Sequence, residues 1–423
     1  MSDELSKTKQ AYAELILRCG VNLQPGESAV IRAELGHREF VRLLVATAYD
    51  LGARFVVVDW SDPLSTRARY QHVDRQYLGY LPEFEVTRRR EMLDEKWKLV
   101  SLTGSEYPEA YEDVDPALLM EDRKGFVAKL KFFMQATMNN EVAWNVAAVP
   151  VIPWAKKVFP ELEADEALER LWEVVLRTCR ADQADPAQAW TNHDRALKKV
   201  AAFMDRHDVR AIRYLDETPG FDGKAATDLT VGLTDRPTWS CGSSLNSQGQ
   251  LFFANIPTEE IFSTPHNQRT DGWVRTTKPG FIFEREVSGA YFRFEAGEVV
   301  EWRAEKGQEV LDQVFELRGA RRLGELSLVD VRSPINQSGV IFYDTLFDEN
   351  AVCHIAFGNA YPEGVQGGGA MSEAELEALG VNSSDAHQDL MIGAETMKVI
   401  GICADGHEVL IMENGMFLDD VLA

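Results

Sequence analysis

The first half of the chain alternates between short apolar runs and segments whose apolar residues have helical spacing. Residues 29–33 and 54–60 are mostly apolar runs of strand length. Residues 37–51, between them, carry apolar side chains three and four positions apart and end at Gly52, as in an amphipathic helix. Continuous apolar strands are typical of a sheet covered on both faces, and strand–helix–strand order favours parallel pairing. The pattern predicts an α/β N-terminal domain with a mainly parallel sheet.

Further elements of this domain follow the same rhythm. We expect two more strands at residues 99–102 and 144–150, and helices at residues 5–18, 124–135 and 164–180. A GxGxxG motif does not follow the first strand, so the sequence gives no support for nucleotide binding.

The pattern changes near residue 210, where short segments of alternating apolar and polar residues begin. Such segments predict strands, which we expect at residues 211–214, 228–233, 280–283 and 290–294, with one helix at residues 307–318. This succession is typical of a mainly antiparallel β (α+β) domain. We therefore predict two domains, residues 1–210 and 211–423, as the length of 423 residues also suggests.

The charge balance narrows the classes of partner. Lysine and arginine number 44 against 68 aspartate and glutamate, which gives a net charge of -24. Nucleic acids and anionic membrane surfaces attract basic patches, so we expect neither as a partner. The charge is compatible with cationic substrates, such as the free amino terminus of a peptide.

Cysteine usage and the N-terminal segment bear on the compartment. The five cysteines are scattered, odd in number and without CxxC spacing, which argues against a disulfide framework and favours a reducing compartment. The first residues contain no apolar signal core, and no run of about 18 apolar residues predicts a membrane span. We expect a cytoplasmic protein.

Candidate metal ligands are concentrated between residues 346 and 391. His387 and Asp389 are two positions apart, so on an extended backbone they point to the same side and can bind one ion. An isolated HxD motif is more often a surface pair or a capped turn, but here the surroundings are glycine-rich. The same stretch also contains Asp348, Glu349, His354 and Tyr361. Mixed carboxylates and imidazoles suit a divalent ion such as Zn, Co or Mn.

Two other segments offer carboxylates. Glu259 and Glu260 are adjacent, and neighbours on a strand point to opposite faces, so at most one of them can serve a given site. Glu325 precedes the apolar strand at residues 326–329, where by itself an ordinary strand-end carboxylate is the more frequent role. Histidines outside these segments have no partner at ligand spacing; among them are His193, for which packing or capping is favoured, His207 and His407.

Four segments together resemble a known family. The chain contains NIPTEEIFSTP, GARRLGELSLV, LFDENAVCHIAFGNAYP and LGVNSSDAHQDLMIG, in that order. These segments are similar to the signatures of the aminopeptidase T, aminopeptidase S and PepS metallopeptidases. The N-terminal half is similar too, in YAELILRCGVNLQPGE and VPVIPWAKKVFPELEADEALERLW. The resemblance therefore extends over essentially the whole chain, which is far more specific than any single motif.

The resemblance implies a metallo-aminopeptidase that removes leucine and other N-terminal residues from short peptides. It implies a water activated by two divalent ions in the C-terminal domain, and a homodimer. Matched motif by motif, the catalytic candidates are Tyr361 and Glu325, and the implied metal ligands are Glu259, Glu325, Glu349, His354, His387 and Asp389. Glu260 stays open as the alternative to Glu259. Two ions carry four positive charges, and three or four of these carboxylates balance them.

Two other functions compete with this interpretation. A distantly related fold holds a single Fe(II) that opens aromatic rings with dioxygen, which needs only about three protein ligands. A non-catalytic peptide-binding protein on the same fold would be expected to have lost a ligand. The carboxylates implied as ligands and Tyr361 favour the peptidase.

Overall fold

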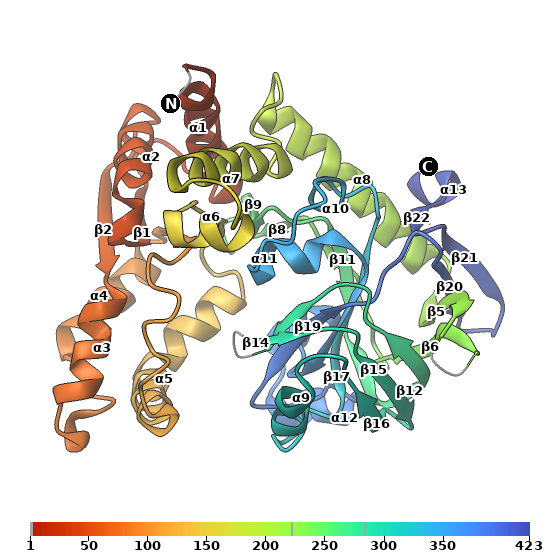
Figure 1. The fold of residues 1–423 in the computed structure, drawn as a ribbon. Helices are drawn as coiled ribbons and strands as arrows, with labels where there is room; N and C mark the ends of the chain where they lie inside the picture. The colour runs from red at the N-terminus through yellow and green to blue at the C-terminus, as the bar shows by residue number, and fades with distance from the viewer. Residues whose placement is uncertain (1–2, 221–222, 283–284) are drawn as a thin grey trace. The chain divides into compact units, whose positions relative to one another are not determined.

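The computed structural model describes residues 3–220, 223–282 and 285–423 (Figure 1). The described chain divides into two compact units. Unit 1 consists of residues 1–191 and 243–257, and unit 2 consists of residues 192–242 and 258–423. The division into folding domains at residue 210 stays a prediction.

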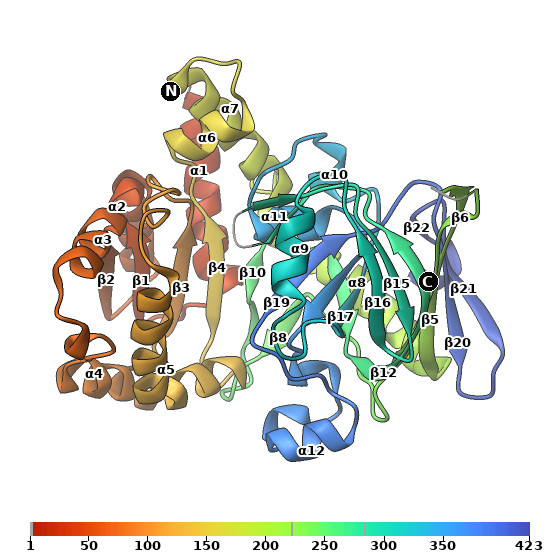
Figure 2. The ribbon, with the colours of Figure 1, turned by 60° about the horizontal axis from the view of Figure 1, so that its bottom comes forward.

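Unit 1 is built on a parallel sheet flanked by helices (Figure 2). Within the described residues its strand order is β10–β4–β3–β1–β2, and every neighbouring pair is parallel. The strands are β1 (Ser28–Glu34), β2 (Phe55–Ser61), β3 (Lys98–Thr103), β4 (Trp144–Ala148) and β10 (Asn255–Ile256). The predicted α/β domain with a mainly parallel sheet is confirmed.

The helices of unit 1 alternate with these strands. They are α1 (Asp3–Leu15), α2 (Arg38–Asp50), α3 (Pro63–His72), α4 (Glu83–Asp94), α5 (Pro116–Met138), α6 (Ile152–Val158) and α7 (Ala164–Thr178). A π-helical turn, Ile16–Gly20, continues α1, and a hairpin of β8 (Ser243–Leu245) and β9 (Leu251–Phe253) precedes β10. Helix α8 (Pro186–Arg206) contains the boundary at residue 191.

One strand of unit 1 differs from the expectation. The apolar run at residues 54–60 predicts a strand covered on both faces, but β2 is the edge strand of the sheet. Its side chains stay partly exposed, with Phe55 at 52% and Trp60 at 44%. The apolar run alone does not show position within a sheet, because an edge strand and a central strand can have the same composition.

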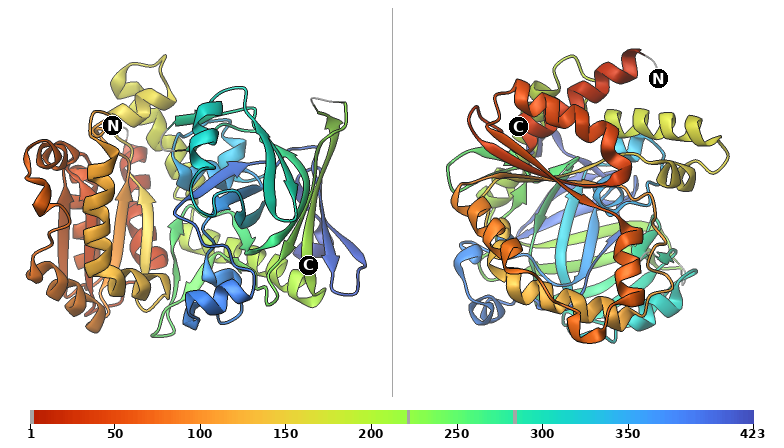
Figure 3. Two further views of the ribbon diagram at one scale, coloured as in Figure 1. Left: turned by 90° about the horizontal axis from the view of Figure 1, so that it is seen from below. Right: turned by 90° about the vertical axis from the view of Figure 1, so that its left-hand side faces the viewer.

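Unit 2 contains two antiparallel sheets (Figure 3). In the described residues, the larger sheet has the order β16–β15–β12–β6–β5–β20–β21–β22 and the smaller has the order β19–β18–β17–β11–β7. The larger sheet comprises β5 (Val209–Pro219), β6 (Ala225–Leu233), β12 (Pro265–Arg275), β15 (Tyr291–Glu295), β16 (Glu298–Arg303), β20 (Lys398–Cys403), β21 (Glu408–Glu413) and β22 (Met416–Phe417). The predicted mainly antiparallel second half is confirmed.

The smaller sheet comprises β7 (Ser240–Cys241), β11 (Glu260–Ser263), β17 (Leu323–Val329), β18 (His354–Gly358) and β19 (His387–Met391). A separate hairpin pairs β13 (Gly280–Ile282) with β14 (Arg285–Val287), and Phe283, which was expected to end the first of these strands, lies outside the described residues. The helices are α9 (Gln308–Val314), α10 (Pro334–Gln337), α11 (Thr345–Asp348), α12 (Glu373–Ala378) and α13 (Asp419–Leu422). In the described part of the chain, no helix has the length and apolar character that a membrane crossing needs.

The two sheets of unit 2 share one apolar core. Phe292 from the larger sheet and Phe357 from the smaller sheet have ring centroids 4.8 Å apart, and Phe294 stacks on Phe357 at 5.8 Å. Phe315, just after α9, closes the cluster at 5.2 Å from Phe357. All four rings are buried. One face of the smaller sheet is covered by this core, so polar side chains of the sheet are left for its other face.

Phe357→Ala is expected to lower the free energy of unfolding of unit 2 by about 3–5 kcal/mol, because it removes the ring that contacts three other aromatics. Urea unfolding followed by tryptophan fluorescence measures the change. The control is Val300→Ala, also in unit 2, whose residue is 41% exposed and whose truncation is expected to cost less than about 0.5 kcal/mol. Equal effects of the two substitutions would contradict the assignment of this core.

Candidate metal centre

The alternation of side chains along the smaller sheet separates apolar from polar residues. In β17, Leu326 and Leu328 belong to the shared core. Glu325 is not a core residue and points to the opposite face of the strand. The same holds in β18, where Ile355 and Phe357 are core residues and His354 is not. Strands β11 and β19 repeat the pattern, and together these strands present Glu260, Glu325, Ser327, His354, His387 and Asp389 on one face.

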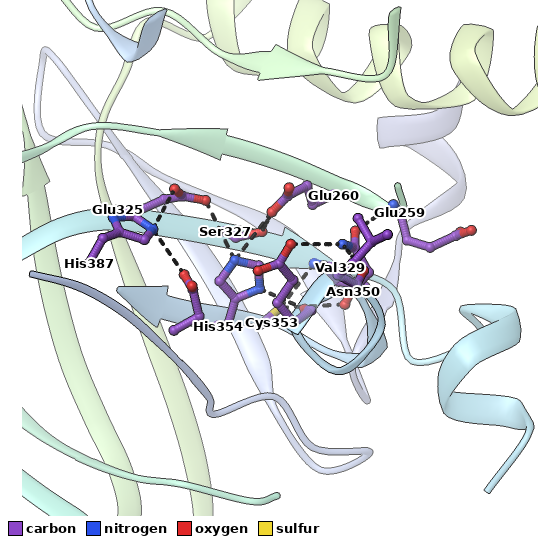
Figure 4. Close-up of polar contacts among 12 residues, drawn as sticks. Glu259, Glu260, Glu325, Ser327, Val329, Asn350, Cys353, His354 and His387 are labelled. Carbon is purple, nitrogen blue, oxygen red and sulfur yellow. Dashed lines mark hydrogen bonds and ion pairs between the residues drawn. The ribbon is translucent and has the colours of Figure 1, made fainter. Parts of the chain in front are cut away.

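The first metal group consists of Glu260, Glu325 and His354, whose ligand atoms all lie within 4.8 Å of one another (Figure 4). Nε2 of His354 is 3.2 Å from Oε2 of Glu260 and 3.5 Å from Oε1 of Glu325. All three residues are buried. Three adjacent strands, β11, β17 and β18, supply one residue each.

The second metal group consists of Glu325, His387 and Asp389, again within 4.8 Å of one another. Nε2 of His387 is 3.3 Å from Oδ1 of Asp389 and 3.7 Å from Oε2 of Glu325. Glu325 therefore belongs to both groups, with Oε1 toward the first and Oε2 toward the second. This is the geometry of a carboxylate that can bridge two cations.

Backbone carbonyls set the orientation of both imidazoles. Nδ1 of His354 is 2.7 Å from the carbonyl oxygen of Glu349, and Nδ1 of His387 is 2.7 Å from that of Asn359. A carbonyl only accepts, so each Nδ1 donates its hydrogen there, and each Nε2 is left facing the carboxylates as the nitrogen that can bind a metal once it gives up its proton. Ser327 donates from Oγ to Oε2 of Glu260 at 2.9 Å and holds that carboxylate in place. Such outer partners are typical of metal-binding histidines and carboxylates.

Crowded carboxylates shift the pKa values of the centre. Burial raises the pKa of Glu325, and the charges of Glu260 and Asp389 add to the rise. The pKa of Glu349 also lies well above its usual range, first through burial and then through Asp389 and Glu260. Burial by itself would lower the pKa of His387, but the contact with Asp389 raises it to about 9. A cation placed among these groups is therefore stabilised.

Glu349 faces a cavity of about 150 Å³ beside the second metal group. It begins a single 3-10 turn, Glu349–Ala351, and Asn350 donates from Nδ2 to its carboxylate at 3.4 Å. The cavity is lined by Phe281, Thr345, Asp348, Glu349, His387, Gln388, Asp389 and Met391. Carboxylates and an imidazole thus face a space large enough for a small substrate group.

Tyr361 lies beside the second metal group. Its ring centroid is 4.8 Å from that of His387, and the residue is 37% exposed. It directly precedes the turn Pro362–Gly364, and its carbonyl accepts a hydrogen bond from Thr264 at 2.8 Å. Burial, followed by the charge of Glu325, raises the pKa of its hydroxyl, so the phenol stays protonated and can donate.

The structure brings Glu260, and not Glu259, together with the other predicted ligands. Among the described residues, Glu259 belongs to neither metal group. Its carboxylate is 3.5 Å from Nε2 of His193, and its backbone N–H donates to Oδ1 of Asn350 at 2.7 Å; Figure 4 shows the side chain directed away from the cluster. Adjacent residues entering a strand point to opposite sides, so only one of the two glutamates can join the group. The contact of His193 with this segment carries no signal in the sequence.

Comparison of the chain with models of known protein families identifies a metalloprotease family, which agrees with these carboxylate and imidazole donors. The model of the thermophilic metalloprotease (M29) family matches residues 5–417. The chain belongs to the M29 family. The resemblance to aminopeptidase T, aminopeptidase S and PepS proteins is thereby confirmed.

Relatives of this M29 chain match it over nearly its full length. Aminopeptidase PepS of Streptococcus thermophilus is 38% identical over 96% of this chain and 97% of its own length. Aminopeptidase T of Thermus aquaticus is 36% identical over 98% and 100%, respectively. Among solved structures, wild-type AmpT from Thermus thermophilus superposes with a TM-score of 0.87 at 35% identity, covering 98% of this chain and 100% of that one.

Glu260→Gln is expected to weaken metal binding by this M29 chain by more than about 100-fold, because the substitution replaces an anionic ligand of the first metal group. Metal content after dialysis into metal-free buffer, measured by mass spectrometry, gives the result. Glu259→Gln is the matched control and is expected to retain its metal. The reverse outcome would make Glu259 the ligand.

Proposed function

We propose that this metallo-aminopeptidase of the M29 family removes leucine and other N-terminal residues from short peptides, using two divalent ions. The observation that carries the proposal is the position of Glu325, with one carboxylate oxygen toward each metal group. A single shared carboxylate between two His/carboxylate groups is the arrangement expected for a two-metal hydrolase.

The donor set supports a pair of Zn, Co or Mn ions. Glu260 and His354 would hold one ion, His387 and Asp389 would hold the other, and Glu325 would bridge them. Glu349, at the cavity beside the second group, is a further ligand candidate. Four carboxylates offset the four positive charges of two divalent ions, and the two neutral imidazoles complete the nitrogen and oxygen donors that these metals prefer.

Divalent ions bound here would supply Lewis acidity, lowering the pKa of a water and polarising the scissile carbonyl. The chain itself provides the proton chemistry. Tyr361 is placed to donate its phenolic O–H to the oxyanion that develops during hydrolysis, because its ring lies against His387 and its hydroxyl stays protonated. Glu349 faces the cavity, and with cations nearby to lower its raised pKa it would be placed to accept the proton of the attacking water. Glu325, the other catalytic candidate, would keep the two metal groups at a fixed distance from each other, because one of its carboxylate oxygens lies toward each.

A homodimer remains the expectation from the resemblance, and aromatic exposure in unit 1 supports it. Tyr77, Tyr80 and Phe84 are 56%, 62% and 67% exposed within eight residues of one another, and Phe55 on the edge strand is 52% exposed. Exposed apolar groups at this density are typical of association surfaces. Light scattering on the purified protein is expected to give twice the chain mass of 47.5 kDa. A mass of one chain at micromolar concentration would refute the dimer.

The competing functions fit the site less well. A single-iron dioxygenase needs about three protein ligands, whereas this centre offers two groups joined by a shared carboxylate. A non-catalytic binding protein is expected to lack a ligand, whereas the described residues form two complete metal groups once Glu260 takes the place of Glu259. Glu349 belongs to neither group and lines the cavity beside the second.

His387→Ala is expected to lower leucyl-p-nitroanilide hydrolysis more than about 100-fold, because it removes a ligand of the second metal group and the ring that supports Tyr361. Chelation of the wild-type protein is expected to abolish hydrolysis, and added Zn or Co to restore it. Metal content and steady-state rates are measured together. Bound iron with no cleavage would favour the dioxygenase instead.

Tyr361→Phe is expected to lower kcat about 100- to 1,000-fold with little change in KM or metal content, because the hydroxyl acts on the transition state. The matched control is Tyr107→Phe, which removes the same atom from an exposed ring in unit 1. A rise in KM alone, with kcat preserved, would assign Tyr361 to substrate binding.

A further inference from the structure

A cluster of metal-binding side chains lies in unit 2 outside the metal groups described above. A ring nitrogen of His207, the Sγ atom of Cys403 and a ring nitrogen of His407 all lie within 4.8 Å of one another. His207 follows the last residue of α8, and the other two flank the turn between β20 and β21. Their separation in sequence hides the cluster, since His207 and Cys403 are almost 200 residues apart.

Backbone hydrogen bonds fix both segments that carry the cluster. Within the turn, Gly406 donates to the carbonyl of Cys403 at 2.9 Å, and Cys403 donates to the carbonyl of His407 at 2.9 Å. The turn is joined to the end of the helix because Ala404 donates to the carbonyl of Asp208 at 3.0 Å. The three ligand atoms are therefore held together by the fold and do not depend on side-chain flexibility alone.

We propose that His207, Cys403 and His407 form a second kind of metal site, for a thiophilic divalent ion such as Zn²⁺. Two imidazoles and one thiolate match the ligands of zinc, with a fourth tetrahedral position left for solvent or an external ligand. The catalytic centre is different, because its proposed donors are oxygen and nitrogen. Cys353, the neighbour of His354, points the other way, with Sγ 3.8 Å from Sδ of Met412 in the shared core.

The carboxylate of Asp405 orients one of the three candidate ligands. Oδ1 of Asp405 is 2.5 Å from Nδ1 of His407. In the tautomer that donates from Nδ1 to this carboxylate, Nε2 carries the lone pair that a metal requires. The carboxylate–histidine pair is the outer arrangement that accompanies zinc-binding imidazoles. The His207 ring is itself positioned by packing on Phe203, with centroids 4.3 Å apart.

The burial of the three ligands suits an ion that enters from solvent. Cys403 is buried at 4% exposure, His207 is intermediate and His407 is exposed. An ion bound there would join the C-terminal end of α8 to the β20–β21 turn and stabilise the folded state by mass action. The site would tie elements of unit 2 together without taking part in peptide hydrolysis.

Co²⁺ is the probe that separates this site from the catalytic centre, because only a thiolate ligand gives the intense sulfur-to-cobalt charge-transfer absorption in the near ultraviolet. The full-length protein is stripped with chelator and titrated with Co²⁺. We expect the band to saturate at ~1 Co²⁺ per chain. Cys403→Ser is expected to abolish the band, and Asp405→Asn to weaken the affinity about 10- to 100-fold.

His407→Gln is a second variant that leaves the core undisturbed, because this side chain is exposed. It is expected to weaken Co²⁺ binding, followed by the same absorption band, more than about 10-fold. Cys241→Ser is the matched cysteine control and is expected to keep the band. Glu260→Gln is also expected to keep it, which separates this test from the aminopeptidase proposal. Absence of the band in the wild-type protein, or its survival in Cys403→Ser, would overturn the proposal.

Discussion

Buried negative charge gathered around Glu325 is the constraint on which the centre depends. Its two carboxylate oxygens lie 3.5 Å and 3.7 Å from the Nε2 atoms of His354 and His387, so two neighbouring strands are coupled through one side chain. Carboxylates at this density repel one another unless positive charge lies between them. Hydrogen bonds from the surrounding structure keep the ligand atoms close despite this repulsion. Backbone carbonyls orient both imidazoles, and Ser327 holds Glu260. The contacts that would attract cations are therefore accompanied by contacts that hold the ligand atoms in place.

The shared apolar core holds the strands that carry the candidate ligands. Strand β17 is buried along its whole length, and its two faces have different roles. Leucines on one face pack against the larger sheet, and Glu325 on the other face joins the metal groups. The period of two along a strand thus lets one element serve folding and chemistry at once. Loss of core packing at Phe357 would also disturb the neighbouring His354, because both belong to β18.

Sequence patterns predicted the fold class well because apolar periodicity reports burial directly. The parallel sheet of unit 1 and the antiparallel sheets of unit 2 both follow from it. The edge position of β2 did not, since composition is the same at an edge and in the middle of a sheet. Strand β10 was also missed, because two residues are too few to show a pattern.

The candidate site was predictable in part. Motif resemblance located Glu325, His354, His387 and Asp389, which the structure gathers on one face. The choice between Glu259 and Glu260 needed the direction of each side chain where β11 begins, which neither motif nor spacing contains. The cluster of His207 with Cys403 and His407 was invisible for a related reason, because antiparallel pairing across a long interval brings them together. Assignment of any of these residues to a metal stays a prediction.

Strand β10 has a consequence for the integrity of the chain. It pairs with β4 in the sheet of unit 1, yet it is followed after three residues by β11, which carries Glu260 in unit 2. The polypeptide thus leaves unit 1, begins unit 2, returns to complete the first sheet and leaves again. A fragment starting at residue 211 would keep β10 without its partner, and the remaining fragment would lose an edge strand. Each unit is made of two separate segments, so neither can be transferred to another protein as a single uninterrupted piece. The two units are therefore expected to be inherited together.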